Sequence, residues 1–313
     1  MKLSYTEFPL DDVHTYPLAS RPSKVTVEQF ARVPPPGATV AEWLDSLPEQ
    51  LAGRDLKRAV AAMRAARAAG RPVIWGLGGH VVKTGLAPVL IDLMWRGYVS
   101  ALALNGAAMI HDFEIAVGGQ TSEDVDAALG PGTFGMAEET AVWLNGAVNA
   151  GVAQGRGLGE SVVRWLASSP DVRHAPASLL CAAARHEVPV TVHVAVGTDI
   201  VHMHPVASGA AIGEGSLRDF RYFTASVSRL AGGIYVNCGS AVVLPEVFLK
   251  AVALVRNRGV ALDGLTTLNL DFIRHYRPQT NVVQRPTRGI GQGLALVGHH
   301  EIMIPLLAAA LRE

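Results

Sequence analysis

The chain has 313 residues, with 27 basic and 27 acidic side chains. A net charge of zero gives no support to a nucleic-acid or anionic-membrane partner, because both attract an excess of positive charge. The N-terminus lacks the apolar core of a signal peptide, and every apolar run is far shorter than the roughly 20 residues of a membrane span. We therefore expect a cytoplasmic protein with no membrane contact.

Residues 1–38 contain prolines at positions 9, 17, 22 and 34 to 36 and read as an irregular arm. Such an arm cannot build its own core, so we expect it to wrap the domain or a neighbouring subunit. Residues 39–313 are expected to form a single domain. The two cysteines, Cys181 and Cys238, are too few for a disulfide framework. High apolar content with little charge suggests surface buried between subunits, as in a homo-oligomer.

Within the expected domain, helical and strand patterns alternate. Helical spacing of apolar residues predicts helices at 40–51, 55–69, 86–95, 136–149, 159–168, 178–185, 216–230, 245–257 and 302–311. Apolar runs predict strands at 72–77, 99–104, 188–196, 233–237, 262–269 and 294–298. Residues 121–135 are expected to form a loop with an acidic helical turn, because residues 121–124 resemble a helix start, and residues 271–292 are expected to form a polar loop. This alternation predicts an α/β fold, a parallel sheet covered by helices on both faces.

Five of the predicted strands end in small or polar residues, and parallel strands end at one edge of their sheet. Glycine at such ends lets a ligand approach backbone N–H groups, which favours phosphate, although one glycine turn alone could be a tight turn only. The strict G-x-G-x-x-G fingerprint is absent. The five clusters are Gly78-Gly79-His80, Asn105-Gly106-Ala107, Gly197-Thr198-Asp199, Cys238-Gly239-Ser240 and Gly298-His299-His300.

An acid/base group is suggested by the segment that follows the second strand. His111, Asp112 and Glu114 are the candidates for proton transfer. Asp112 could instead cap a helix, and Glu114 could be a solvated carboxylate in a first helical turn. No G-x-S-x-G elbow is present to anchor a hydrolase triad.

Other histidines and arginines suggest a pocket for the substrate. His202 and His204 could chelate a metal, but no H-E-x-x-H or Cys/His signature is present, so we expect them to line a pocket and expect no metal. The segment 274–288 holds four arginines, among them Arg285 and Arg288. It is either a solvated loop or a lid whose guanidinium groups bind carboxylate or phosphate.

In their order along the chain, these segments resemble the deoxyhypusine synthase family over about residues 70 to 313. GGHVVKTGL resembles the first glycine loop of that family, and LNGAAMIHDFE resembles its T-x-G-G-x-E-E-D-F segment. VPVTVHVAVGTD, GGIYVNCGSAVV, TTLNLDF and LVGHHEIMIPLLAAAL resemble its later strand ends. The resemblance implies a Rossmann-like doubly wound α/β/α domain and a tetramer with NAD at its subunit interfaces.

Carried over residue by residue, the resemblance implies an NAD site in which Asp199 contacts a ribose. Lys83 would neutralise a phosphate or carboxylate, and His299 stands where the family usually has an aspartate. The implied cofactor-binding residues are Gly79, His80, Lys83, Asn105, Gly106, Ala107, Asp199, Gly239, Ser240, Thr267, Asn269 and His299.

The chain departs from that family where its catalytic lysine should be. The W-G-K motif is missing from RHYRPQTNVVQRPTRGIGQG, and Arg277, Arg285 and Arg288 stand where acidic polyamine-binding residues are usual. A basic pocket would repel a polyamine. We therefore expect no deoxyhypusine synthase activity.

NGAAMIHDFE also resembles the N-A-x-A-x-H-D-I-E motif of archaeal-type ornithine cyclodeaminases, in which NAD transiently oxidises an amino acid. We therefore expect an NAD-dependent transferase or lyase that acts on a small amine or amino acid by transient hydride transfer. The alternatives are a catalytically silent nucleotide sensor, a cyclodeaminase-like deaminating enzyme and, third, a metal-dependent hydrolase.

Overall fold

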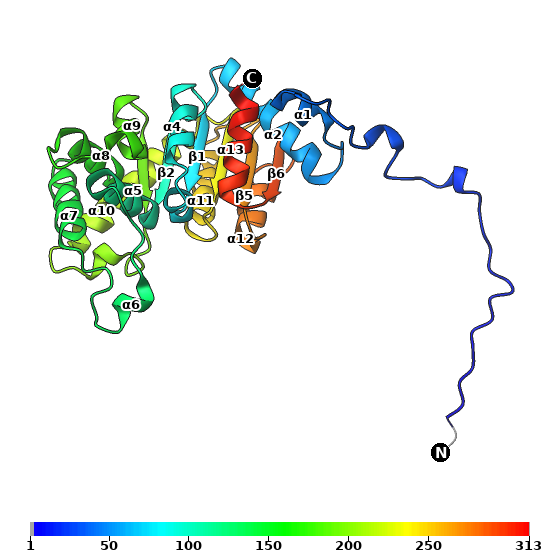
Figure 1. Cartoon of the computed structure of the whole chain (residues 1–313), viewed down its shortest axis with the longest axis horizontal. Coiled ribbons are helices and arrows are strands. Elements are labelled where there is room, and N and C mark those ends of the chain that lie inside the picture. Colours follow the sequence, from blue (N-terminus) through cyan, green and yellow to red (C-terminus); the bar gives the residue numbers. More distant parts are fainter. Residues whose placement is uncertain (1–2, 313) are drawn as a thin grey trace.

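In the computed structural model, which describes residues 3–312, six parallel strands form one sheet in the order β3-β2-β1-β4-β5-β6 (Figure 1). The predicted parallel α/β fold is confirmed. This order is the one found in dinucleotide-binding α/β domains. The strands are β1 (Val73–Leu77), β2 (Ala101–Asn105), β3 (Val190–His193), β4 (Ile234–Cys238), β5 (Thr266–Asp271) and β6 (Gln292–Val297).

Helices connect the strands and cover both faces of the sheet (Figure 1). The α-helices are α1 (Val40–Ser46), α2 (Leu51–Ala68), α3 (Gly79–Lys83), α4 (Ala87–Trp95), α5 (Gly106–Gly118), α6 (Val125–Leu129), α7 (Glu138–Ala153), α8 (Leu158–Ser168), α9 (Leu179–Arg185), α10 (Gly209–Val227), α11 (Val243–Asn257), α12 (Tyr276–Pro278) and α13 (His300–Arg312). Shorter turns are η1 (Leu18–Ser20), η2 (Val27–Gln29), η3 (Ala175–Ala177), η4 (Ile200–Met203) and the π-helical η5 (Gln279–Gln284).

The core has two halves because neighbouring residues of a strand point to opposite faces of the sheet. Ile74 and Tyr235 pack with α10 and α11 on one face. Trp75 and Leu102 pack with α2, α4 and α13 on the other face. All four side chains are almost fully buried, so the strands are apolar on both sides, as a covered parallel sheet requires.

Several predicted elements differ from the observed ones; for example, the strand predicted at 188–196 is limited to Val190–His193, and α6 lies within residues 121–135. The helix predicted at 40–51 ends at Ser46, and α2 starts anew at Leu51, because Pro48 lies between them. The strand predicted at 262–269 starts only at Thr266, after a turn in which Gly264 has a φ of 74°. The helix predicted at 216–230 begins earlier, at Gly209. The loop predicted at 271–292 contains α12 and η5.

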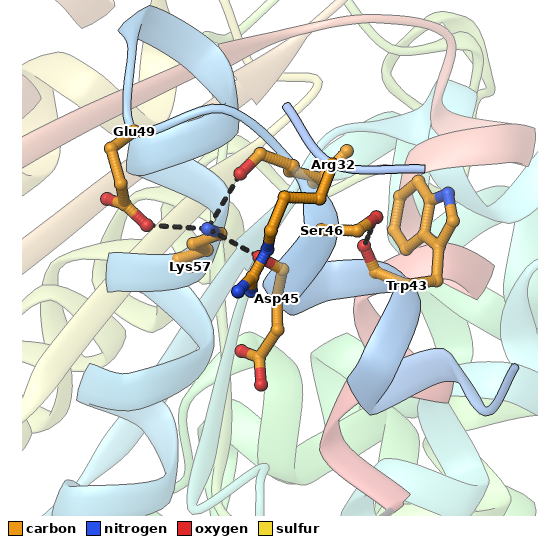
Figure 2. A network of polar contacts seen from close by, with 7 residues as sticks. Arg32, Trp43, Asp45, Ser46, Glu49 and Lys57 are labelled. Carbon is orange, nitrogen blue, oxygen red and sulfur yellow. Dashed lines mark hydrogen bonds and ion pairs between the residues drawn. The ribbon is translucent and has the colours of Figure 1, made fainter. Parts of the chain in front are cut away.

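The N-terminal arm runs away from the body of the protein (Figure 1). Its apolar side chains are exposed, including Tyr5 at 87% and Phe8 at 84%, so the arm does not wrap its own domain. It joins the body at Arg32, whose backbone N–H donates to the carbonyl of Ser46 at 2.8 Å. Figure 2 shows this junction beside Lys57, which bonds the Glu49 carboxylate at 2.5 Å.

Among residues 3–312, no helix combines the length and the apolar character needed to cross a membrane.

Candidate functional site

The direction of the strand order reverses between β1 and β4, which are neighbours in the sheet. At such a switch point ligands bind beyond the carboxyl ends of the strands. We call the edge where the strands end the carboxyl edge. Here Gly78 directly follows β1 and Gly239 directly follows β4, and a Cβ on Gly78 would overlap the carbonyl oxygen of Gly239. Gly239 has a φ of 69°, a conformation that favours glycine. The two turns therefore meet through backbone alone.

Three rings gather beside these turns. The centre of the His80 ring lies 5.6 Å from that of His300 and 5.8 Å from that of Phe272. The ring centres of His300 and Phe272 are 6.2 Å apart. His300 is fully buried, and its Nε2 lies 3.2 Å from the carbonyl oxygen of Leu270. Since a carbonyl only accepts, Nε2 carries the hydrogen, and Nδ1 is a buried acceptor with no partner within residues 3–312. Burial lowers the pKa of His300, so the ring is neutral at neutral pH.

The sequence analysis selected His299 from this histidine pair. The structure leaves His299 exposed, with its Nδ1 3.8 Å from the Glu301 carboxylate. Because α13 begins at His300, the first helical residue points inward and its predecessor does not. The pairing of the two histidines was visible in the sequence, but the helix phase that decides between them was not. Phe272, an exposed ring after β5, was also missed.

Asp199 faces the start of α5 on the other side of the carboxyl edge. A Cβ on Gly106 would overlap the Asp199 carboxylate, so a side chain at that position would displace the carboxylate. Oδ2 of Asp199 is buried without a hydrogen-bond partner, and burial raises the pKa of this carboxyl. Nε2 of His202 lies 3.9 Å from Oδ2, while Nδ1 of the same ring accepts from the N–H of Gly197 at 3.1 Å. Nδ1 of His202 therefore binds the backbone of its own loop, and Oδ2 of Asp199 has no hydrogen-bond partner within residues 3–312.

A chain of hydrogen bonds joins α5 to the following loop. Nδ1 of His111 lies 2.7 Å from Oγ1 of Thr121, and that hydroxyl donates to the Glu114 carboxylate. Thr140 on α7 donates to the other Glu114 oxygen at 3.1 Å. Burial and the nearby charge of Lys83 lower the pKa of His111. His111 and Glu114 are thus brought together through Thr121, a residue that sequence reasoning missed because it lies in a loop.

Asp112 is separated from this chain. Its side chain is completely buried and accepts from the Ser178 hydroxyl at 2.5 Å and from the backbone N–H groups of Leu179 and Leu180 at 2.7 and 2.9 Å. It therefore ties α5 to the start of α9. Helix capping was weighed from the sequence, but the helix that Asp112 caps lies far along the chain. Because both oxygens of the buried Asp112 carboxyl already accept hydrogen bonds from Ser178, Leu179 and Leu180, neither oxygen is open to a substrate.

Several other candidates make local structural bonds. Asn105 caps α5 through the N–H of Ala108 at 2.9 Å, and Ser240 accepts from the N–H of Leu244 at the start of α11. His204 lies 3.5 Å from the N–H of Val206. Within the sheet, Thr267 donates to the carbonyl of Val282, and Asn269 accepts from Asn237. Gly79, His80 and Lys83 lie in α3, directly after β1, and Ala107 lies in the first turn of α5.

Arg285 and Arg288 are not brought to the carboxyl edge. They follow η5 and precede β6, so they lie toward the opposite edge, where the strands begin. Arg285 bonds Asn281 at 2.8 Å, and the backbone between the two arginines is held at Pro286 by Arg256 from the end of α11. The segment is a folded helical return across the sheet, which the sequence analysis took for a loop.

An apolar cavity of about 230 Å³ lies at the opposite edge from the candidate site. Its lining includes Ala101 at the start of β2, Pro189 before β3 and Phe223 of α10. No acid/base pair faces it. Within residues 3–312, no group of three or more His, Cys, Asp or Glu side chains is arranged to hold a metal ion.

Neither the family models nor the curated proteins contain a match to this chain. Solved structures do match. AgrE in its ternary complex with ornithine and NAD+ gives a TM-score of 0.52 at 16% identity, over 83% of this chain and 33% of that one. A conserved protein from Methanococcus maripaludis S2 assigned to the LOR/SDH type also gives 0.52 at 16% identity, over 90% and 73%. A protein from Entamoeba histolytica assigned as a deoxyhypusine synthase gives 0.51 at 11% identity, over 88% and 93%.

At these identities the likeness is one of fold. The strand order and the matches define a Rossmann-like α/β protein with the fold of the deoxyhypusine synthase and LOR/SDH types. The chain spans about a third of the length of AgrE and of ArgZ, an arginine dihydrolase from the ornithine-ammonia cycle in cyanobacteria.

Replacing Asp112 with Asn should destabilise the protein by about 1–3 kcal/mol, because an amide N–H₂ would face backbone donors in a buried site. Burial raises the pKa of Asp112 from 3.8 to about 6. The folded protein therefore binds an extra proton between about pH 4 and pH 6, and the contribution of Asp112 to stability falls as pH rises through that window.

Urea unfolding of the wild type and Asp112→Asn across that pH window would measure both effects. The exposed Asp126 gives a matched control as Asp126→Asn. Equal stability of wild type and Asp112→Asn at every pH would show that Asp112 does not tie α5 to α9.

Proposed function

We propose that this protein is an NAD-dependent enzyme that acts on a small amino acid or amine by transient hydride transfer. The observation that carries this proposal is the switch point between β1 and β4, where Gly78 and Gly239 meet through backbone alone. Along the same carboxyl edge lie two buried acceptors without partners within residues 3–312, Nδ1 of His300 and Oδ2 of Asp199. Such acceptors suit the hydroxyl and amide donors of a dinucleotide. The residues present therefore fit the cofactor.

In this proposal the cofactor is held by backbone at the glycine turns and by side chains on both sides of them. Asp199 accepts from a ribose hydroxyl, and His300 accepts from a second donor. The rings of His80 and Phe272 offer flat apolar surface. The proposed cofactor residues are Gly79, His80, Lys83, Asn105, Gly106, Ala107, Asp199, Gly239, Ser240, Phe272 and His300.

NAD, when bound, supplies a centre that accepts and returns a hydride. His111 is the proposed proton acceptor, because burial and Lys83 keep its ring neutral. Glu114 orients it through Thr121. Lys83 is exposed and free to attract a carboxylate or phosphate of the substrate. An amino acid fits this cationic group better than a polyamine does, and the likeness in fold to AgrE, solved with ornithine and NAD+, agrees with it.

A catalytically silent nucleotide sensor is the second candidate. The segment 272–291 contains no lysine where the deoxyhypusine synthase family carries its catalytic one. A sensor would bind the nucleotide but would never reduce it. Fluorescence of reduced nicotinamide after mixing protein, NAD and ornithine or arginine separates the two candidates, since only the enzyme produces a transient signal.

Calorimetry with NAD, NADP and ADP-ribose tests the cofactor assignment. We expect NAD to bind and Asp199→Ala to weaken its binding by about 1–3 kcal/mol, because a hydrogen bond from a ribose hydroxyl to a carboxylate is lost. Asp126→Ala should bind as the wild type does. Absence of binding for all three nucleotides would contradict the proposal, and unchanged affinity in folded Asp199→Ala would place the ribose elsewhere.

The exposed apolar arm and the resemblance to a tetrameric family together suggest a homotetramer. In such an assembly another subunit would bury the exposed apolar side chains of the arm, among them Tyr5, Phe8 and Tyr16. Light scattering at micromolar concentration should give the mass of four chains. A mass of one chain would contradict the proposed assembly.

A further inference from the structure

The hydrogen bonds around Thr121 allow one arrangement of hydrogens. Both oxygens of Glu114 accept, one from the Thr140 hydroxyl and one from the Thr121 hydroxyl. A hydroxyl has a single hydrogen, and Thr121 gives it to Glu114. Toward His111, 2.7 Å away, Oγ1 of Thr121 can therefore only accept. The donor in that bond is Nδ1 of His111, which must carry the hydrogen.

The opposite side of the imidazole faces the glycine turn. A Cβ on Gly79 would lie 3.1 Å from Cδ2 of His111, the carbon bonded to Nε2. Nε2 makes no hydrogen bond within residues 3–312. When the ring is neutral and Nδ1 carries its hydrogen, Nε2 holds a lone pair. The edge of the ring that faces the end of β1 is therefore the basic edge.

We propose that Thr121 is a positioning residue whose hydroxyl, oriented by Glu114, fixes the Nδ1–H tautomer of His111 and leaves the lone pair on Nε2, next to the ring carbon that lies against Gly79. The tautomer is a property of the protein without ligand. The use of that lone pair as a base rests on the proposed function. Thr121 lies in the loop after α5, so closing this loop onto Glu114 also sets the protonation of the site.

A structural role for Thr121 would be different. It would hold the loop against α5 and affect stability, but it would leave the hydrogen of His111 free to reside on either nitrogen. The test must therefore read the tautomer directly. Nitrogen-15 NMR does this, because a ring nitrogen with a hydrogen and one with a lone pair have distinct chemical shifts.

The experiment uses full-length protein labelled with nitrogen-15 in its histidine rings, at a pH above the His111 titration, without NAD or substrate. The His111 signals are assigned by their loss in His111→Gln. We expect the wild type and Thr121→Ser to show the hydrogen on Nδ1. Thr121→Val removes the hydroxyl at similar volume and should move the hydrogen to Nε2 or give a mixture. Thr133→Val is the matched control, because the hydroxyl of Thr133, in the next loop after α6, bonds only a backbone carbonyl.

Hydrogen on Nε2 in the wild type would overturn the proposal, whether or not the variants fold. An unchanged Nδ1–H tautomer in folded Thr121→Val would also overturn it. Failure of NAD binding would contradict the proposed function and leave this result untouched, so the two proposals fail separately.

Discussion

The candidate site depends on the backbone contact between the end of β1 and the end of β4. These strands are neighbours in the sheet. The chain leaves β1 toward β2 and leaves β4 toward β5, so the connections that follow the two strands run in opposite directions. Gly78 has no room for a side chain there, since a Cβ would overlap the carbonyl of Gly239. His80 follows this contact on the β1 side. His300, at the start of α13 after β6, lies against the β4 side, since a Cβ on Gly239 would lie 3.1 Å from its Cε1.

Buried carboxylates hold the segments around that contact. Asp112 ties α5 to α9, and Asp219 on α10 accepts from the N–H groups of Gly159 and Val192 at 2.9 and 2.8 Å. Burial raises the pKa of Asp219 to about 7. Both carboxyl groups accept from buried backbone N–H groups. Glu114 differs because its bonds lead to another titratable side chain, His111.

The sequence predicted the strand ends well because their signal is local. An apolar run followed by glycine marks a strand end, and parallel strands share an edge, so the convergence of Gly79, Asn105 and Gly239 needed no knowledge of strand order. The sequence did not show that α13 begins at His300, which buries the His300 ring and leaves His299 exposed. Arg285 and Arg288 were predicted to lie at the site because the π-helical η5 was not visible in the sequence, and it returns the chain toward the opposite edge. The sequence marks Thr121 only as part of a helix start, because its bonds to His111 and Glu114 exist only once the loop folds back.

The central claim is that NAD binds beyond the ends of β1 and β4. A crystal structure of the protein with NAD tests this most directly. The account predicts the pyrophosphate against the backbone at Gly78–Gly79 and Gly239, with a ribose hydroxyl on Asp199 and a donor on Nδ1 of His300. NAD bound at the amino-terminal edge, in the cavity beside Phe223, would contradict it.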